Sequence, residues 1–440
     1  MGILREITLI KVLFFLMFLS ASWDIFANIK VSGYSVRLFY FIEMFLLLIL
    51  AYRMYEEKHY TLKVFPGHTF FVIWMLFIFY AIPNTTILTR NIGYFAWLLL
   101  SYLLLILIIN FITSKEKFLE YVKIYLYSYI AMATFGLVQF IAGLFGISLK
   151  TAQWWIPGVL PRVNGLNYEP SYYGTYISGG AAFLYWLTFI EKREIIPYQK
   201  FLTLFTILIT LLSTSRIAML TLFFIILIHI FKEVIIPVSK GVLTKTGLKV
   251  VLVYSFLLSA AVVYLLTHIE KFLLLFWGIG LFGMSAHSVI DRLAGTIDTF
   301  KIFLENPIIG VSLGGIPSHR AMLYDILITT QVEAKNFEGL NVLVEVMAAS
   351  GVIGFIFFVS FWINALYMHR KLASILKRKN HLLVALANAA GMMVFTEMFA
   401  LLFNQNILRP YLWLSIGIYM VSLRILQEEA HSIGNEKAGS

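Results

Sequence analysis

Residues 92–112 read IGYFAWLLLSYLLLILIINFI, an apolar stretch of 21 residues without a charged side chain. About 20 predominantly apolar residues are enough for a helix to cross the hydrocarbon core of a bilayer. Comparable runs recur along the chain, which is 60% apolar and 13% charged, with a mean hydropathy of +0.86. The sequence therefore predicts an all-α, polytopic membrane protein.

Apolar runs separated by charged residues, glycines and prolines predict about twelve transmembrane helices. Their expected centres lie near residues 17, 45, 75, 101, 132, 181, 207, 226, 258, 355, 392 and 417. The first run lacks a small-residue cleavage site, so we expect it to stay attached as the first span. With the N-terminus placed inside, most basic residues fall in cytoplasmic segments, which predicts that both termini are cytoplasmic.

The formal charge of +11 is explained by this placement of basic residues in short loops, so nucleic acid is not an expected partner. The chain has no cysteine, which excludes disulfides, thiolate metal sites and a cysteine nucleophile. Any catalysis must use other side chains.

The predicted organisation has four parts. Residues 1–266 hold the first nine spans with an outer loop near 147–170, residues 267–340 form one large outer loop, residues 341–426 hold the last three spans, and residues 427–440 form a cytoplasmic tail. Within the large loop, apolar residues at helical spacing predict an amphipathic helix over 291–305 on the membrane surface. Three glycines in residues 270–284 favour a re-entrant or interfacial segment there.

Residues 162–174 read RVNGLNYEPSYYG and place Arg162 and Glu169 at the mouth of a span. A lone cation beside the bilayer is costly unless it has an anionic partner. Arg216 and Arg409 lie at two further outer turns, so three arginines at three outer helix ends indicate one shared anion, and guanidinium suits bidentate binding of phosphate. Two structural alternatives stay open: Arg216 as a snorkelling residue of a tight turn, and Glu169 as a helix-start residue that favours the helix dipole.

The chain resembles the bacterial O-antigen polymerase and O-antigen ligase superfamily in the order of these segments. The segments are residues 162–174, Ser215-Arg216, the helix of Asp291-Arg292 leading into Asn306-Pro-Ile-Ile-Gly310, and residues 341–354, NVLVEVMAASGVIG. The span count and the single large loop are similar as well.

The resemblance implies a GT-C-like fold and glycosyl transfer on the periplasmic face of the bacterial inner membrane, from a saccharide attached to undecaprenyl pyrophosphate, without metal or cofactor. It implies that Arg162, Arg216 and Arg292 contact the pyrophosphate, with Arg409 as a fourth. The implied partners are undecaprenyl-pyrophosphate-linked oligosaccharides, inner membrane lipids and a chain-length regulator protein.

Ligase-type members of the superfamily carry a His-Asn-x-x-Leu pattern before a Gly-x-x-Gly turn. When that turn is aligned with Gly351 and Gly354, Leu340 stands in place of the histidine and Asn341 follows as expected. The missing histidine favours a polymerase. Asn341 is then a candidate for positioning the acceptor.

The group that activates the acceptor is left open, and the candidates are Glu169, His319, Glu345 and His287. Glu169 is the first choice. His319 is expected in a flexible outer loop, where its ordinary pKa suits proton transfer near neutral pH, although a solvated loop histidine is the plainer interpretation. Glu345 lies one helical turn after Asn341 on the same face, and it could also simply pair with an arginine.

The sequence thus favours a polymerase that transfers a growing glycan from undecaprenyl pyrophosphate to a lipid-linked repeat unit. One alternative is an O-antigen ligase, which transfers the polysaccharide to the lipid A core. A second is a transporter, in which the acids Glu43, Glu397 and Asp24 relay protons within the spans, unless they are buried structural groups with Arg37 paired to Glu43.

Overall fold

The computed structural model describes residues 2–31, 34–57, 59–150, 153–156, 160–242, 244–267, 287–377, 380–403 and 407–438. Its α-helices are α1 (Gly2–Ser20), α2 (Leu38–Glu56), α3 (His68–Tyr80), α4 (Leu88–Phe111), α5 (Lys115–Leu144), α6 (Pro170–Tyr185), α7 (Gln199–Leu212), α8 (Arg216–Ile230), α9 (Ile236–Ser239), α10 (Lys245–Thr267), α12 (His287–Glu305), α13 (Ile316–Met322), α14 (Gln331–Ala334), α15 (Val342–Leu376), α16 (His381–Leu401) and α17 (Pro410–Ala438). Its strands are β1 (Asn28–Val31), β2 (Tyr34–Arg37), β3 (Gln153–Ile156) and β4 (Leu160–Arg162).

A helix covers every predicted span centre. The apolar runs between charged or glycine-containing breaks correspond to these helices. Among the described residues, 6 helical segments are long and apolar enough to cross a membrane. They are α2, α4, α5, α15, α16 and the continuous segment Arg216–Ser239. The protein is therefore a helical membrane protein by length and composition. Twelve complete spans are not shown: α3 has 13 residues and α7 has 14, each about 20 Å at 1.5 Å per residue, against a hydrocarbon core of about 30 Å.

Local sequence fixes several helix starts. The side chains of Ser114, Ser215, Asn341 and Asn380 each accept a hydrogen bond from a backbone N–H in the first turn of the helix that follows. Pro170 occupies the first position of α6, where its missing N–H costs nothing. The structure confirms the predicted start of this helix directly after Glu169.

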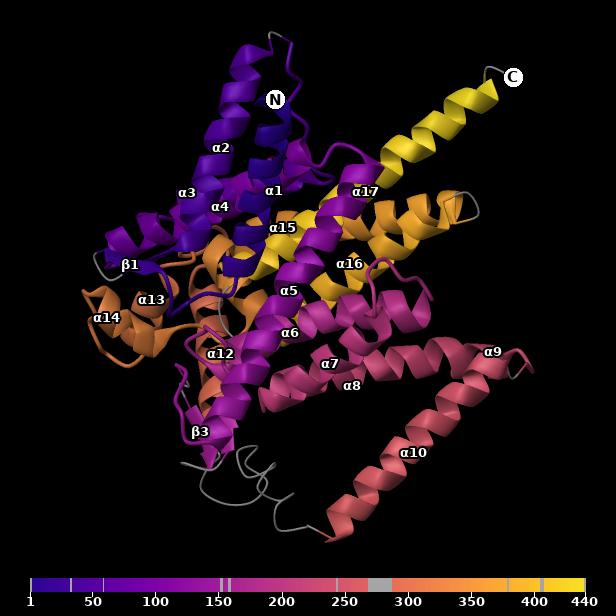
Figure 1. Cartoon of the computed structure of the whole chain (residues 1–440). Coiled ribbons are helices and arrows are strands. Elements are labelled where there is room, and N and C mark those ends of the chain that lie inside the picture. The colour runs from indigo at the N-terminus through magenta and orange to yellow at the C-terminus, as the bar shows by residue number, and fades with distance from the viewer. Residues whose placement is uncertain are drawn as a thin grey trace.

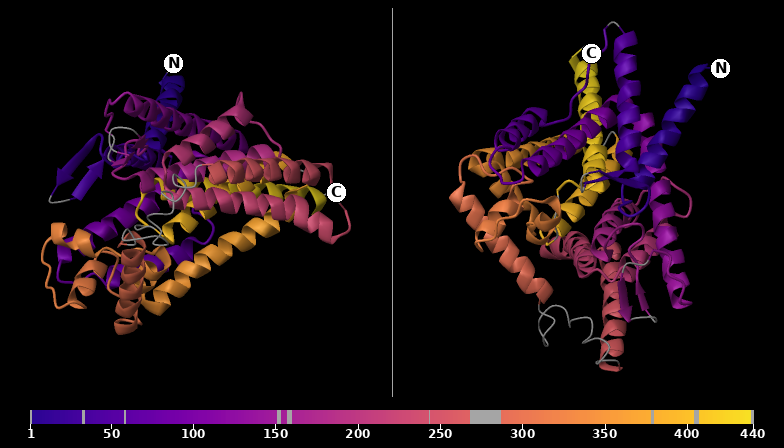
Figure 2. Two further views of the ribbon diagram at one scale, coloured as in Figure 1. Left: turned by 90° about the horizontal axis from the view of Figure 1, so that it is seen from below. Right: turned by 90° about the vertical axis from the view of Figure 1, so that its left-hand side faces the viewer.

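The core of the bundle is formed by contacts between helices far apart in sequence together with contacts between consecutive ones. α16 packs against α6 and α17, α15 against α3, α17 against α4, and α1 against α5 and α2. Figure 1 shows α10 at the edge of this bundle, where it contacts α8 and the segment Phe231–Ile235. The free ends of α1 and α17 lie on the same side of the molecule (Figure 1 and the right-hand view of Figure 2).

The connections opposite those ends contact one another and form what we term the loop end of the bundle. Its described segments are 21–31, 34–37, 81–87, 145–150, 153–156, 160–169, 213–215, 287–341, 402–403 and 407–409. Backbone bonds from Asp24 and Ile25 to the Leu166 carbonyl join two of these segments, and the Tyr34 hydroxyl bonds to the Thr89 carbonyl at the start of α4. The loop end is a single packed region.

Two antiparallel hairpins at the loop end correct the all-α prediction. β1 pairs with β2 so that Asn28 faces Arg37, and β3 pairs with β4 so that Gln153 faces Arg162. Strands of three or four residues are too short to show a period in the sequence, so they were expected to be loops. The second hairpin matters for the site because it carries Arg162.

The helix predicted over 291–305 is present within α12, which begins four residues earlier at His287. Leu293, Ile297, Phe300 and Leu304 are exposed, whereas Asp298 is buried on the face that packs against the protein. An exposed apolar stripe on a helix of a membrane protein suits contact with lipid, as the sequence predicts. The expected re-entrant segment, residues 270–284, lies outside the described residues. At the other end of the chain, α17 continues past residue 426 through most of the predicted tail.

Candidate functional site

Arg162 is held at the loop end by neutral groups. Its Nε donates to the Thr214 hydroxyl at 2.8 Å, its Nη1 donates to Gln153 Oε1 at 2.6 Å, and its Nη2 donates to the Thr214 carbonyl at 3.5 Å. Thr214 has a positive φ of 49°, which is a costly conformation for a β-branched residue. The turn between α7 and α8 is thus bent so that both oxygens of Thr214 face Arg162.

Arg216 is the first residue of α8, and its side chain is exposed. The start of a helix carries a partial positive charge, so a cation there is unfavourable unless an anion is near. Arg292, on the first turns of α12, donates from Nη1 to the Phe403 carbonyl at 2.5 Å. These two arginines approach one another closely enough for their charges to interact.

Arg162, Arg216 and Arg292 form what we term the arginine cluster. Burial lowers the pKa of Arg162, the positive charge of Arg216 lowers it further, and the carboxylate of Glu169 opposes the shift. Among the residues that the structure describes, no carboxylate lies within 4.0 Å of any of the three guanidinium groups. The cluster is a concentration of positive charge that has no direct ion pair among the described residues and that Glu169 offsets only in part.

Glu169 directly precedes α6 and lies in the same loop segment as Arg162. Its side chain is exposed and accepts a hydrogen bond from the Ser171 hydroxyl at 3.0 Å, and it makes no capping bond to the α6 backbone. Its charge acts on Arg162 without a direct ion pair. The carboxylate is therefore accessible and close to the cluster.

Arg409 is placed apart from the arginine cluster, in a buried ion pair with Asp24. Its Nη1 lies 2.9 and 3.1 Å from the two carboxylate oxygens, and its guanidinium stacks 3.7 Å from the centre of the Tyr172 ring. Arg37 binds the same carboxylate at 2.8 Å. Arg409 thus already has an anionic partner, and it contacts the first turn of α6 through the Tyr172 ring.

Asn341 and Arg292 bind adjacent backbone carbonyls just after the end of α16. The Asn341 side-chain N–H donates to the Leu402 carbonyl at 2.9 Å, next to the carbonyl that Arg292 binds, while its oxygen caps α15. Both the nitrogen and the oxygen of the Asn341 side chain therefore make structural hydrogen bonds. The predicted turn from Asn341 to Glu345 is present, since the Glu345 N–H bonds to the Asn341 carbonyl at 2.9 Å.

Glu345, in the first turn of α15, and His319 make their contacts outside the arginine cluster. Glu345 is 6% exposed and lines a small pocket with Tyr94 and Glu338. His319 was expected in a flexible loop, but it lies in α13, where its Nδ1 is 3.1 Å from the Gly315 carbonyl. The prediction missed this short helix because Pro317 at its start and the glycines before it suggested a loop. The side chain of His287 lies outside the described residues.

Buried charges beside α13 tie the large loop to the bundle. Arg90 is fully buried in α4 and bonds to Glu338, to Gln331 and to the Gly314 carbonyl. Arg320 pairs with Asp298 at 3.2 Å and donates to the Glu338 carbonyl at 3.0 Å. These arginines have partners, in contrast to the arginine cluster.

The acids considered for proton relay do not form one group. Asp24 pairs with Arg37 and Arg409, so the predicted pairing of Arg37 with Glu43 is wrong. Both carboxylate oxygens of Glu43 are buried without a hydrogen-bond partner among the described residues. Glu397 accepts a bond from the Ser415 hydroxyl at 3.0 Å in the middle of the bundle.

The sequence names the three arginines as candidates but gives no signal of the residues that bind them. Thr214 and Gln153 hold Arg162 in place, and neither carries a local signal of that role. No group of three or more potential metal-ligating side chains occurs among the described residues. Comparison with known proteins finds no matching family model and no matching curated protein.

Proposed function

We propose that this chain is a membrane glycosyltransferase that polymerises lipid-linked repeat units, with the arginine cluster as the binding site for the donor pyrophosphate. The observation that carries the proposal is the set of three guanidinium groups without a carboxylate partner in the described residues, at the loop end of a helical membrane protein. Uncompensated cations near a bilayer are costly, and a pyrophosphate would offset that cost with several charge-assisted hydrogen bonds.

The proposed reaction is displacement at the anomeric carbon of the donor saccharide. The acceptor hydroxyl oxygen forms a bond to that carbon, the bond from the carbon to the pyrophosphate oxygen breaks, and the bonding electron pair leaves with undecaprenyl pyrophosphate. Negative charge grows on the leaving group, so the arginines stabilise the transition state more than the bound donor.

Glu169 is the group we propose to accept the proton from the acceptor hydroxyl. It is exposed, near Arg162, and free of a capping bond to the helix that it precedes. Its bond from Ser171 orients the carboxylate. His319 and Glu345 lie with the partnered charges around α13 and have no part in this step.

The test is a reconstituted assay with undecaprenyl-pyrophosphate oligosaccharide as the only glycan substrate. The proposal predicts a ladder of repeat lengths that is lost in Arg162→Ala and Arg216→Ala and kept in Lys30→Ala, which removes an exposed cation from the same end of the bundle. Normal folding of each variant is checked by gel filtration and thermal unfolding. Glycosylation of an added lipid A core acceptor without any ladder would contradict polymerase activity and indicate a ligase.

A further inference from the structure

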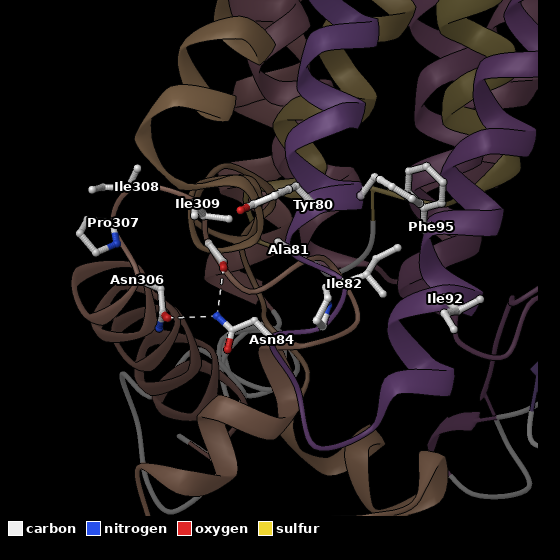
Figure 3. Close-up of a pocket in the computed structure, with 13 residues that line it drawn as sticks. Tyr80, Ala81, Ile82, Asn84, Ile92, Phe95, Asn306, Pro307, Ile308 and Ile309 are labelled. Atoms are coloured by element: carbon white, nitrogen blue, oxygen red, sulfur yellow. Dashed lines mark hydrogen bonds between the residues drawn. The ribbon is translucent and has the colours of Figure 1, made fainter.

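An open groove of about 900 Å³ lies on the surface between the end of α3, the start of α4 and the loop that follows α12. In Figure 3, Ile308 and Ile309 lie on one side, Ile92 and Phe95 on the other, and Tyr80 between them. None of the residues that line the groove belongs to the arginine cluster. Its volume lies in the range of about 300–1,000 Å³ that is typical of small-molecule sites.

One wall of this groove is held in place by a break in a membrane helix. Gly351 interrupts α15 with a φ of +63°, and the freed backbone of the helix is bonded by the loop instead. The Val352 N–H donates to the Pro307 carbonyl at 2.7 Å, and the Val311 N–H donates to the Ala348 carbonyl at 2.9 Å. Because a β-carbon at Gly351 would lie 2.2 Å from the Ile308 carbonyl oxygen, the loop can approach the helix only at a glycine. The groove is therefore preformed.

The lining of the groove is neutral and mostly apolar. It contains no aspartate, glutamate, lysine, arginine or histidine, and its polar groups include the Tyr80 hydroxyl and the linked amides of Asn84 and Asn306, 3.2 Å apart. The rim continues into exposed apolar side chains, with Phe79 at 55% and Ile308 at 60% exposure. Such a surface offers nothing to hold a charged head group, but it suits a hydrocarbon chain.

The position of the groove on a candidate membrane span indicates the kind of occupant. Ile92 and Phe95 lie four and seven residues into α4, a candidate membrane span, which is about 6–10 Å from its first residue at 1.5 Å per residue. At that depth the surroundings of the helix are lipid chains and not water. We propose that the groove binds an acyl chain of a membrane phospholipid in the leaflet at the loop end, and that it selects the chain and not the head group.

The test uses the full-length protein in phosphatidylcholine vesicles doped with a phosphatidylcholine that carries a photoreactive diazirine on one acyl chain. After illumination, cross-linked peptides are identified by mass spectrometry. We expect cross-links to concentrate on the peptides that contain residues 79–95 and 306–310, above the level on the exposed apolar face of α7. A double variant, Ile92→Trp with Ile309→Trp, should fill the groove and reduce its cross-links several-fold, while cross-links on α7 stay unchanged.

Leu204→Trp is the matched control, because Leu204 is 58% exposed on α7 and lies outside the groove. It should leave the groove cross-links at the wild-type level. Replacing the labelled phosphatidylcholine by labelled phosphatidylglycerol should change nothing, since the lining is neutral. Groove labelling no higher than that of α7, or unchanged in the filled variant, would overturn the proposal. Displacement of the label by a small fraction of an isoprenyl phosphate would also overturn it, because the groove would then select an isoprenoid chain.

Discussion

Replacing Arg216 by glutamine should stabilise the ligand-free protein, which is the opposite of what loss of a structural arginine does. The Arg216 side chain is exposed, has no ion pair in the described part of the chain, and lies near two other cations. Exposed charge pairs are worth about 0.2–1 kcal/mol, so relief of two repulsions should raise the free energy of unfolding by up to about 1 kcal/mol. Removal of a cation from the start of α8 acts in the same direction.

Arg320→Gln provides the matched comparison at the same end of the bundle. Arg320 pairs with Asp298, and these side chains are 13% and 6% exposed. Its loss leaves a buried carboxylate with fewer partners and should cost about 1–3 kcal/mol. Both variants are measured by thermal unfolding in the same detergent at low salt, without ligand. If Arg216→Gln is destabilised as much as Arg320→Gln, Arg216 has a structural partner and the reasoning about an uncompensated cluster is refuted.

The remaining predictions concern the supports of the site. Asp24→Ala should cost about 3–5 kcal/mol of stability, because it leaves buried Arg409 without its carboxylate; a loss below about 1 kcal/mol in chemical unfolding would contradict the ion pair. Gly351→Ala should lower the melting temperature clearly, since an alanine would be strained at φ +63° and its β-carbon would meet the backbone of the loop; an unchanged melting temperature would show that α15 is not broken there. Backbone bonds from Thr329 and Thr330 lower the pKa of Glu333, so its stabilising effect is present above the unfolded pKa and is lost as pH falls through the lower folded pKa. Glu333→Gln should therefore show a weaker loss of stability at acid pH than the wild type, and equal acid sensitivity would argue against the α14 capping box.

The sequence predicted the helices well because each apolar run reports directly on membrane burial. Runs such as residues 92–112 need no partner to be recognised, and the stripe from Leu293 to Leu304 shows its period within one helix. The length of a helix is harder to predict, because apolar residues continue beyond the helix: Val64 and Phe65 precede α3, and Ile195 and Ile196 precede α7. The hairpins were not predicted because strands of three or four residues are too short to show an alternating pattern in the sequence.

Arg162, Arg216 and Arg409 could be chosen from the sequence because a cation at a helix end is conspicuous, and Arg292 followed from the resemblance, but their partners could not be predicted. The ion pair of Asp24 with Arg409 joins residues 385 positions apart, and the sequence around either residue does not indicate its partner. Thr214 gives no signal either, since its role depends on a positive φ that only the folded turn imposes. Prediction therefore found which cations lie at the loop end, and the structure separates the cluster from the cations that already have partners.

The central claim is that Arg162, Arg216 and Arg292 form one site for a lipid-linked pyrophosphate. The most direct measurement is the affinity of the purified protein for undecaprenyl pyrophosphate, determined by calorimetry in detergent for the wild type, Arg216→Gln and Arg320→Gln. A lost charge-assisted hydrogen bond costs about 1.5–3 kcal/mol, so Arg216→Gln should bind at least about tenfold more weakly, whereas Arg320→Gln should bind like the wild type. Equal affinity of the wild type and Arg216→Gln for the pyrophosphate would contradict the claim.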